Sequence, residues 1–298
     1  MNFLTKAAPI IFVLLWSTGF VGSKLGAPYI EPWAFLTIRF IAVLPILFVL
    51  ALLLTKKWPT SPGAILHCVV IGMLVHGVYL GGVFWAIKQG MPAGASSIIV
   101  GLQPVLTAFM AVLLLKESVS GKHWLSMAIG ATGLVLVLGP KFDLSGTGIT
   151  PATIAAAFVA VVGISFGTVY QKRFAQNIDL LAATTWQYVG ALLVTVPFSL
   201  FETWQITWSG ELIFAMVWLV FGLSVGAILL LMLLIREGAV SQVASLFYLV
   251  PVATAVESYF LFEETLSYVQ IGGMVLVISA VLTIRGSTGK PRSRRLQA

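Results

Sequence analysis

Long apolar runs separated by short polar links are the dominant pattern along this chain. A helix that crosses a bilayer needs about 20 consecutive, predominantly apolar residues, and ten runs approach or exceed that length. They are Ala7–Leu25, Trp33–Leu54, Ala64–Ile87, Ala93–Leu115, Lys122–Gly139, Ala152–Gln171, Leu180–Leu200, Leu212–Ile235, Val240–Phe262 and Ser267–Ile284. The pattern predicts an all-α integral membrane protein with ten transmembrane helices. The first run is interpreted as a retained helix, with a signal peptide as the alternative.

Composition narrows the class of protein. Of the 298 residues, 59% are hydrophobic and 9% are charged, whereas soluble domains average about 45–50% and about 25%. The chain is therefore not a soluble enzyme, a disordered protein or a nucleic-acid binder. The single cysteine, Cys68, excludes an internal disulfide and a cysteine-based metal cluster.

Motifs that would indicate an enzyme are missing from the sequence. It has no Gly-rich phosphate loop ending in Lys-Ser or Lys-Thr and no His-Glu-x-x-His pair. His67, His76 and His123 do not have the spacing of metal ligands. We therefore expect a protein that is not an enzyme and that has no cofactor and no metal site.

The distribution of basic residues predicts the orientation in the membrane. Cytoplasmic loops of membrane proteins are enriched in Lys and Arg. With the N-terminus placed in the cytoplasm, thirteen Lys and Arg residues fall on the cytoplasmic side, and only Lys24, Lys88 and Lys141 fall on the other side. The basic tail Lys290–Arg295 is then placed near anionic lipid headgroups. Both termini are predicted to be cytoplasmic.

The sequence repeats itself at an offset of 148 residues, which becomes 147 further along the chain. The matches involve polar, charged, Gly and Pro positions as well as apolar ones. They pair Ser17 with Ser165, Gly19 with Gly167, Lys24 with Lys172, Glu31 with Asp179, Lys88 with Arg236, Gly90 with Gly238, Pro104 with Pro251 and Glu117 with Glu264. The repeat predicts two related halves, residues 1–145 and 146–298.

Each half contains five predicted helices, so the second half enters the membrane from the opposite side. This arrangement is an inverted-topology repeat, in which a substrate site lies near the midplane between the halves and access alternates as they rock. We expect two inverted five-helix repeats around a central cavity. The alternative is a duplication that stabilises a symmetric bundle without transport.

Polar and aromatic residues deep within the predicted helices are the candidate lining of that cavity, because polar groups in a bilayer usually face a cavity or a partner. His76, Tyr79, Gly72 and Val83 are predicted to share one face of the third helix. The substrate-binding candidates as a set are Trp16, Phe20, His76, Tyr79, Gln103, Ser165 and Tyr248. For His76, an interhelical hydrogen bond is the alternative to cavity lining. The lining suits an amphipathic or aromatic small solute.

Two further pairs of residues have open interpretations. Pro104 and Pro251 lie within equivalent runs and are predicted bending points, with static kinks as the alternative. Arg39 and Glu257 lie near the same predicted end, where they form an ion pair, share a vestibule or extend to the interface.

The sequence resembles the drug/metabolite transporter superfamily of EamA type over essentially its whole length. The resemblance rests on Trp16-Ser17-Thr18-Gly19-Phe20 and on the pairs Pro104…Glu117 and Pro251…Glu264. With His76 and Tyr79, it is most like the YddG branch, exporters of aromatic amino acids from bacterial inner membranes. The resemblance implies a cavity lined by helices 1, 3, 4, 6, 8 and 9, peripheral helices 5 and 10, and export; it leaves Trp186, Gln187 and Tyr188 in doubt as site residues.

The expected function is secondary transport: export of small amphipathic metabolites, amino acids and aromatic ones among them, by alternating access. The expected partners are a small-molecule substrate and the lipid bilayer, with no nucleic acid, and a monomer is compatible with this scheme. The alternatives are a channel-like facilitator, a multidrug or nucleotide-sugar-type carrier of the same fold, and a membrane scaffold without transport.

Overall fold

The structure is a computed structural model that describes residues 3–55, 57–138, 148–237, 240–262 and 266–286. Within these residues it is entirely helical. The helices of the first half are α1 (Phe3–Gly26), α2 (Pro32–Leu54), α3 (Pro62–Gly72), η1 (Met73–Val78), α4 (Tyr79–Lys88), α5 (Ala93–Val100), α6 (Gln103–Leu115) and α7 (Gly121–Leu138). Those of the second half are α8 (Pro151–Phe174), α9 (Leu180–Ser199), α10 (Gly210–Trp218), η3 (Leu219–Ala227), α11 (Ile228–Glu237), α12 (Val240–Ser245), η4 (Leu246–Tyr248), α13 (Leu249–Phe262) and α14 (Tyr268–Gly286).

The described helices overlap the apolar runs of the sequence. In the described residues, seven continuous helical segments are long and apolar enough to cross a membrane, and Gln103–Leu115 and Tyr268–Thr283 are shorter apolar helices. The described part of the chain is therefore all-helical and contains several membrane-length helices. Three features used in the sequence analysis lie outside the described residues: Glu264, the predicted boundary between the halves at 145/146, and the basic tail.

Interruptions divide four of the helical runs in the described residues. Segments η1 and η3 are π-helical turns within the third run of each half. The fourth run of each half is also interrupted, after Val100 in the first half and by the 3₁₀ turn η4 in the second. The interruptions therefore fall in corresponding runs of the two sequence halves.

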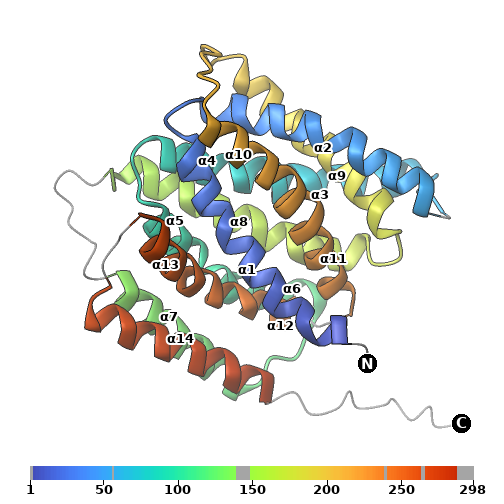
Figure 1. Cartoon of the computed structure of the whole chain (residues 1–298). Helices are drawn as coiled ribbons and strands as arrows, with labels where there is room; N and C mark the ends of the chain where they lie inside the picture. Colours follow the sequence, from blue (N-terminus) through green and yellow to red (C-terminus); the bar gives the residue numbers. More distant parts are fainter. Residues whose placement is uncertain (1–2, 56, 139–147, 238–239, 263–265, 287–298) are drawn as a thin grey trace, which may run out of the picture.

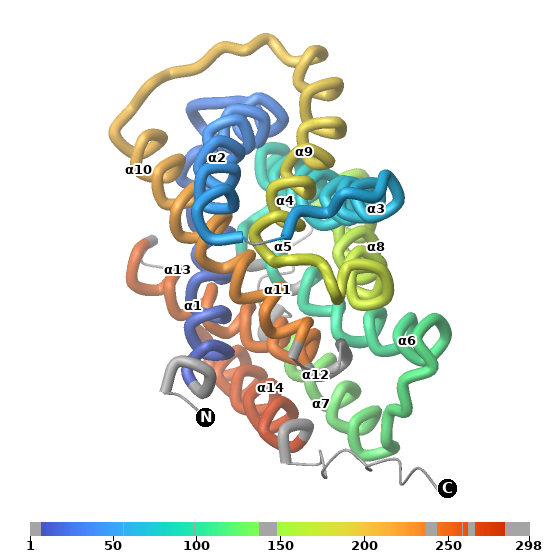
Figure 2. The backbone as a smooth tube through the Cα atoms, turned by 90° about the vertical axis from the view of Figure 1, so that its right-hand side faces the viewer, coloured from blue at the N-terminus to red at the C-terminus, as the bar shows by residue number. Residues whose placement is uncertain are grey.

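Helix α1 crosses the front of the molecule in Figure 1. Helices α7 and α14 pack side by side at one edge in both Figure 1 and Figure 2, and α2 packs along α9 at the other. The main apolar core lies between these edges and draws on both halves, with Phe12, Phe40, Tyr79, Ile164 and Leu219 among its members.

Glycines allow helices α3 and α9 to pack unusually closely. A Cβ atom added to Gly72 would overlap the backbone carbonyl of Gln187, and one added to Gly190 would overlap that of Val69. Small residues at such contacts let helix backbones approach one another in membranes. This contact joins the third run of the first half to the second run of the second half.

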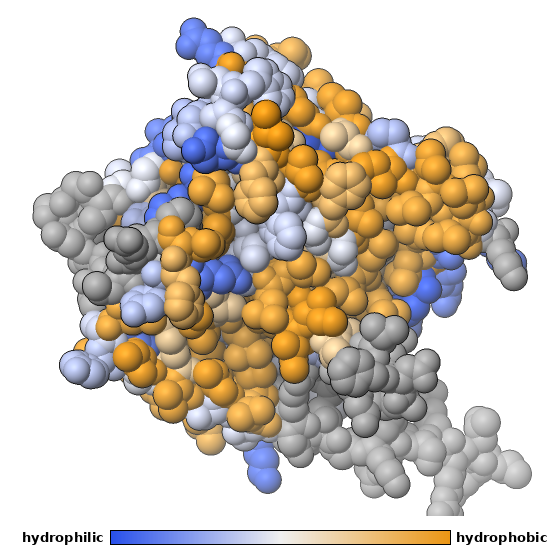
Figure 3. Space-filling view, viewed as in Figure 1, coloured by the Kyte–Doolittle hydropathy of each residue, from blue (hydrophilic) through white to orange (hydrophobic). Residues whose placement is uncertain are grey.

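The outer surface is strongly apolar. Orange, hydrophobic residues cover much of the face shown in Figure 3, and exposed members include Leu53 at 75% and Phe260 at 74%. Soluble monomers rarely expose apolar patches beyond a few hundred Å², and larger ones mark contact with other molecules or with lipid. The surface is that of a protein surrounded by lipid.

Two glutamates exchange hydrogen bonds between the halves at one end of the bundle. Glu202, in the link before α10, accepts from the backbone N–H groups of Trp33 (3.0 Å) and Ala34 (2.6 Å) at the start of α2. Glu31, the residue before α2, accepts from the N–H and hydroxyl of Thr203 (2.7 and 2.9 Å) and from the N–H of Trp204 (3.1 Å). Each glutamate therefore accepts from backbone groups next to the other glutamate. This reciprocal arrangement, called here the carboxylate exchange of Glu31 and Glu202, links the two connections to each other.

Basic residues tie helix ends together through backbone carbonyls. Lys88 donates to the carbonyl of Ala27 at 2.7 Å. Lys172 donates to the carbonyl of Ile235 at 2.8 Å, and Arg236 donates to that of Ile178. Lys88 and Arg236 are equivalent in the sequence repeat, and each contacts the connection that follows the first helix of its own half.

Candidate functional site

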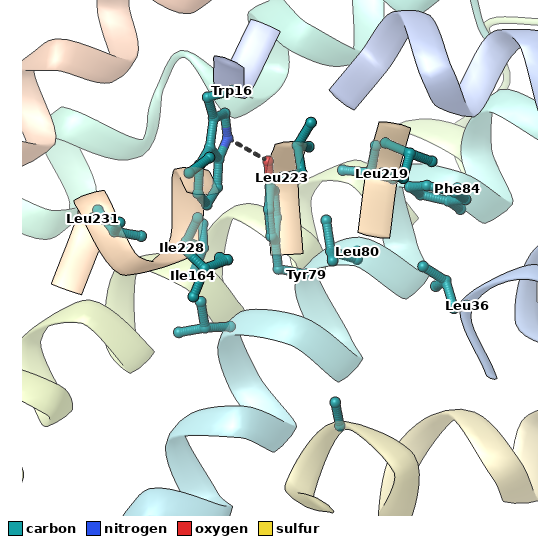
Figure 4. Packing of buried hydrophobic residues seen from close by; sticks show 14 of the residues in the cluster. Trp16, Leu36, Tyr79, Leu80, Phe84, Ile164, Leu219, Leu223, Ile228 and Leu231 are labelled. Atoms are coloured by element: carbon teal, nitrogen blue, oxygen red, sulfur yellow. Dashed lines mark hydrogen bonds between the residues drawn. The ribbon is translucent and has the colours of Figure 1, made fainter. Parts of the chain in front are cut away.

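A small cavity lies where α1, α2, the third run of the first half and the third run of the second half meet. Its volume of about 20 Å³ is room for about one water molecule. It is lined by Trp16, Gly19, Phe20, Arg39, Val75, Tyr79, Leu80, Val83, Phe84, Leu223 and Ile228. Figure 4 shows Trp16, Tyr79 and Leu223 close to one another in this region.

Trp16 and Tyr79 form one aromatic wall of the cavity. Their rings are nearly parallel, with an interplanar angle of 17° and centroids 6.2 Å apart. The indole Nε1–H of Trp16 donates to the Tyr79 hydroxyl at 3.2 Å, the dashed line in Figure 4. Because that hydroxyl oxygen acts as an acceptor here, its own proton is available to donate to a solute.

Arg39 is the one charged side chain among the described residues that line the cavity. It is 1% exposed although it lies in a membrane-length helix. Its Nε donates to Ser224 Oγ at 3.0 Å, and its Nη1 has no hydrogen-bond partner among the described residues. The cavity therefore combines apolar walls with one buried guanidinium.

Arg39 and Glu257 do not form the ion pair that the sequence left open. The Glu257 carboxylate instead accepts from Ser17 Oγ at 2.5 Å, which joins α13 to α1. The alternative that Arg39 extends to the interface is also wrong, because its side chain is buried. The sequence could not distinguish these cases, since they depend on which face of α2 turns inward.

His76 does not share a face with Tyr79, contrary to the prediction. Its Nε2–H donates to Gln187 Oε1 at 3.3 Å, and its ring stacks on Tyr188 with centroids 4.7 Å apart. It therefore faces α9, whereas Tyr79 faces Trp16 of α1. The reason is the π-helical turn Met73–Val78, which adds a residue to the turn and changes the direction of the side chains relative to an α-helix.

Gln187 and Tyr188, which the sequence left in doubt, thus surround His76 rather than the cavity. The edge of the Phe40 ring contacts Tyr188, with centroids 5.3 Å apart. The Tyr188 hydroxyl donates to the carbonyl of Ser224 at 3.3 Å. Since Ser224 also accepts from Arg39, the His76 cluster and the cavity are neighbours.

Gln103 and Ser165 lie together between α6 and α8 and are not among the residues that line the cavity. The Ser165 hydroxyl donates to the backbone carbonyl of Gln103 at 3.5 Å. The side-chain amide of Gln103 is fully buried, and neither its nitrogen nor its oxygen has a partner among the described residues. Such an amide is available to a solute that reaches it.

Tyr248 faces α7 instead of the cavity. Its hydroxyl donates to the carbonyl of Met127 at 3.0 Å, and it belongs to a separate apolar cluster with α7 and α14. Its neighbour Phe247 contacts Trp16 edge to face, with centroids 5.2 Å apart. The 3₁₀ turn η4 changes the helical phase at this point, so the residue that meets Trp16 is one position earlier than predicted.

Pro104 and Pro251 lie at breaks between helices rather than in the middle of bent ones. Pro104 occupies the first turn of α6, directly after the interruption at Gly101 and Leu102, and Pro251 occupies the first turn of α13 after η4. A proline in a first turn removes no intrahelical hydrogen bond. The prolines therefore begin new helical segments.

No group of three or more metal-ligating side chains exists among the described residues. What the interior offers instead is a water-sized chamber with aromatic walls and one guanidinium, inside a bundle of membrane-length helices. Ligand sites are typically apolar cavities with a few placed polar groups. These features define a candidate small-molecule site of a membrane transporter.

The chain belongs to the EamA-like transporter family. The family profile matches it twice, over residues 7–139 and 151–286. The family and the relatives are transporters rather than enzymes. The relatives and the apolar helices also support a multi-pass inner-membrane protein.

Curated relatives match nearly the whole chain at low identity. A protein of Bacillus subtilis named "uncharacterized transporter YvbV" is 25% identical over 91% of this chain and 88% of its own. A Salmonella typhimurium protein named "probable amino-acid metabolite efflux pump" is 24% identical over 91% of each chain. The "uncharacterized inner membrane transporter YedA" of Escherichia coli is 25% identical over 91% and 87%.

One solved crystal structure shares the fold. It superposes with a TM-score of 0.76 and covers 94% of this chain and 98% of its own, at 20% sequence identity. A likeness at that identity supports the arrangement of the helices and carries no information on substrate.

Proposed function

We propose that this chain is a secondary transporter that exports small amphipathic metabolites, amino acids and aromatic ones among them, by alternating access. The observation that carries the proposal is the cavity between the halves. Trp16 and Tyr79 come from the first half, and Leu223 and Ile228 from the second. A solute held there touches both halves, so relative motion of the halves changes its access to either side.

The size of the cavity supports a carrier over an open pore. A volume of about 20 Å³ holds about one water, so a metabolite fits only after the helices move apart. The interruptions next to Pro104 and Pro251 are the proposed bending points, because the helices already end and restart there.

The proposed architecture is two inverted halves, residues 1–145 and 146–298, with both termini cytoplasmic. The paired π-helical turns, the paired breaks in the fourth runs and the double match to the family profile support the repeat. Export is supported by the Salmonella relative, whose name describes an efflux pump.

The proposed contacts in the cavity are Trp16, Phe20 and Tyr79, which already line it. His76, Gln103, Ser165 and Tyr248 stay proposed contacts of a more open conformation. For Gln103 the supporting observation is its unpartnered amide. For His76 it is the buried Nδ1, which has no hydrogen-bond partner in the described part of the chain.

The test is a flux screen in proteoliposomes with labelled amino acids and cationic drugs. Saturable counterflow of an amino acid supports a carrier, whereas single-channel current steps indicate a facilitator and preferential movement of the drugs indicates a multidrug carrier. No flux of any solute indicates a scaffold. Topology reporters inserted after residues 117 and 264 test the inversion separately: they belong on opposite faces of the membrane, and finding both on the same face rejects the inverted repeat.

A further inference from the structure

We infer that Arg39 is the anchor for a carboxylate group of the transported solute, an assignment that rests on the proposed function and specifies its substrate class. The guanidinium lines the cavity, is 1% exposed, and has an unpartnered Nη1 among the described residues. The solute would be a monocarboxylate with an apolar or aromatic body, the class to which neutral amino acids belong.

The argument begins with the missing counter-ion. Removing a charged group from water costs on the order of several kcal/mol, so buried charges are nearly always paired. The Nε of Arg39 donates to a neutral hydroxyl, Ser224 Oγ. The nearby titratable groups that interact with its charge are Tyr79, Tyr188 and His76. None of these is an anion at neutral pH, so the charge has no neutralising partner in the described part of the chain.

The acids of the surrounding helices are engaged elsewhere. Glu257 accepts from Ser17 through Oε1 and leaves its Oε2 without a hydrogen-bond partner among the described residues, but it makes no ion pair with Arg39 there. Glu31 and Glu202 bind backbone groups in the link before α10 and at the start of α2. Asp179 accepts from the start of α9. An arginine required only for packing would be expected to have one of these carboxylates within reach.

The chemistry of the cavity lining then suits a carboxylate on an apolar body, which enters once the helices have moved apart. A guanidinium presents five N–H donors in a planar fork that suits the two oxygens of a carboxylate. Tyr79 adds a hydroxyl donor on the same cavity. The lining also includes Trp16, Phe20 and Phe84, which are suited to an apolar or aromatic side chain.

The experiment compares acids with their decarboxylated or amidated analogues. The probes are L-phenylalanine, L-phenylalaninamide and 2-phenylethylamine, and L-leucine with 3-methylbutylamine. Counterflow in proteoliposomes and thermal stabilisation of the detergent-purified full chain are measured for wild type, R39M and R39K. R173M is the matched control, because Arg173 donates to the carbonyl of Leu114 at the exposed end of α8.

The expected result is that wild type prefers each acid over its amine at least tenfold and that R39M loses this preference, while R39K keeps part of it and R173M keeps all of it. R39M removes a buried charge without removing bulk, so we expect it to fold. If R39M does not fold, the preference of wild type for the acids and its change in R39K still test the assignment of Arg39.

Two outcomes overturn the assignment and separate it from the transport proposal. Wild type that moves the amines as well as the acids, or R39M that keeps the preference, rejects Arg39 as the anchor and leaves a transporter. Neither flux nor acid-dependent stabilisation for any probe rejects both proposals.

Discussion

Two buried polar groups of the third helical run lie one turn apart and have different surroundings. His76 stacks on Tyr188 and has a hydrogen-bonding partner on α9. Tyr79 lies on the cavity beside the unpaired charge of Arg39. Both are fully buried, so burial of a polar side chain does not by itself identify a site in a membrane protein. Hydrogen-bonding groups and charges that have no partner are a better indication of a site than burial alone.

The largest expected effect is on the aromatic wall of the cavity. Trp16→Ala removes that wall and the hydrogen bond to Tyr79, and we expect counterflow of the best-transported amino acid to fall at least tenfold. Trp16→Phe keeps most of the bulk and is expected to retain intermediate flux. Trp208→Ala, at a 59% exposed tryptophan, serves as the control. Equal flux in Trp16→Ala and the control would remove Trp16 from the site.

A smaller effect is expected from the two tyrosine hydroxyls. Tyr79→Phe leaves the Trp16 N–H without its acceptor and removes the free donor on the cavity, so we expect flux to fall several-fold. Tyr188→Phe loses a bond to the backbone of Ser224 but no group on the cavity. The comparison is read from counterflow at equal protein density. A larger loss of flux in Tyr188→Phe than in Tyr79→Phe would indicate that the hydroxyl important for transport is that of Tyr188, beside His76.

His76→Ala is expected to impair transport less than Trp16→Ala while leaving the protein in the membrane. It removes the bond to Gln187 and the stack on Tyr188, and an unpaired buried amide costs about 1–3 kcal/mol. Thermal unfolding in detergent should therefore show a clear loss of stability. Gln187→Leu is the matched variant, since it removes the same bond from the other side. Wild-type efflux in both would confine His76 to packing.

The smallest expected effect is a pH dependence at the carboxylate exchange. Burial raises the pKa of Glu202 above its ordinary value, and this outweighs the N–H groups of Trp33 and Ala34, which lower it. The packed state therefore holds this proton more tightly than the unfolded state. The tighter proton binding adds to the free energy of unfolding in full at pH values below 4.5, the ordinary pKa of a glutamate. This addition is lost as the pH rises through the raised pKa of Glu202 in the folded protein.

The Glu202→Gln variant tests that sign. Wild type should lose melting temperature relative to the variant as pH rises from mildly acid to neutral, by on the order of one or two degrees. The measurement is thermal unfolding in one detergent across pH. Parallel curves for the two proteins, or a relative gain toward neutral pH, would contradict the assigned direction.

The helical ranges could be predicted from the sequence because the length and apolarity of a run determine whether it forms a membrane-length helix. Each predicted run is helical within the described residues, for example Pro151–Phe174 against the predicted Ala152–Gln171. The helix ends also follow local chemistry: Thr150 and Ser209 cap α8 and α10 with their side chains. Both effects act within a few residues of the chain.

The direction of individual side chains could be predicted only where a helix is regular. Trp16 and Phe20, on the uninterrupted α1, line the same cavity as expected. The π-helical turn before Tyr79 and the 3₁₀ turn before Leu249 each alter the phase, which directed His76 and Tyr248 away from the cavity. Gly-rich stretches such as Gly72 to Gly82 were the available signal of irregular packing.

Arg39 was missed as a cavity residue because a single arginine near a predicted helix end fits the interface as well as the interior. Its burial depends on Ser224 and Tyr188, which are more than 140 residues away in the chain. Long-range packing of this kind leaves no periodic pattern in the sequence.

The carboxylate exchange of Glu31 and Glu202 bears on where the molecule can move. Five hydrogen bonds link the connection before α2 with the connection before α10, and each half both gives and receives. If the halves rock as proposed, they pivot about this linked pair of connections, and the largest displacements occur at the far ends of α1 and α11. Distances between labels on the two halves should then change least across the carboxylate exchange and most between the far ends of α1 and α11.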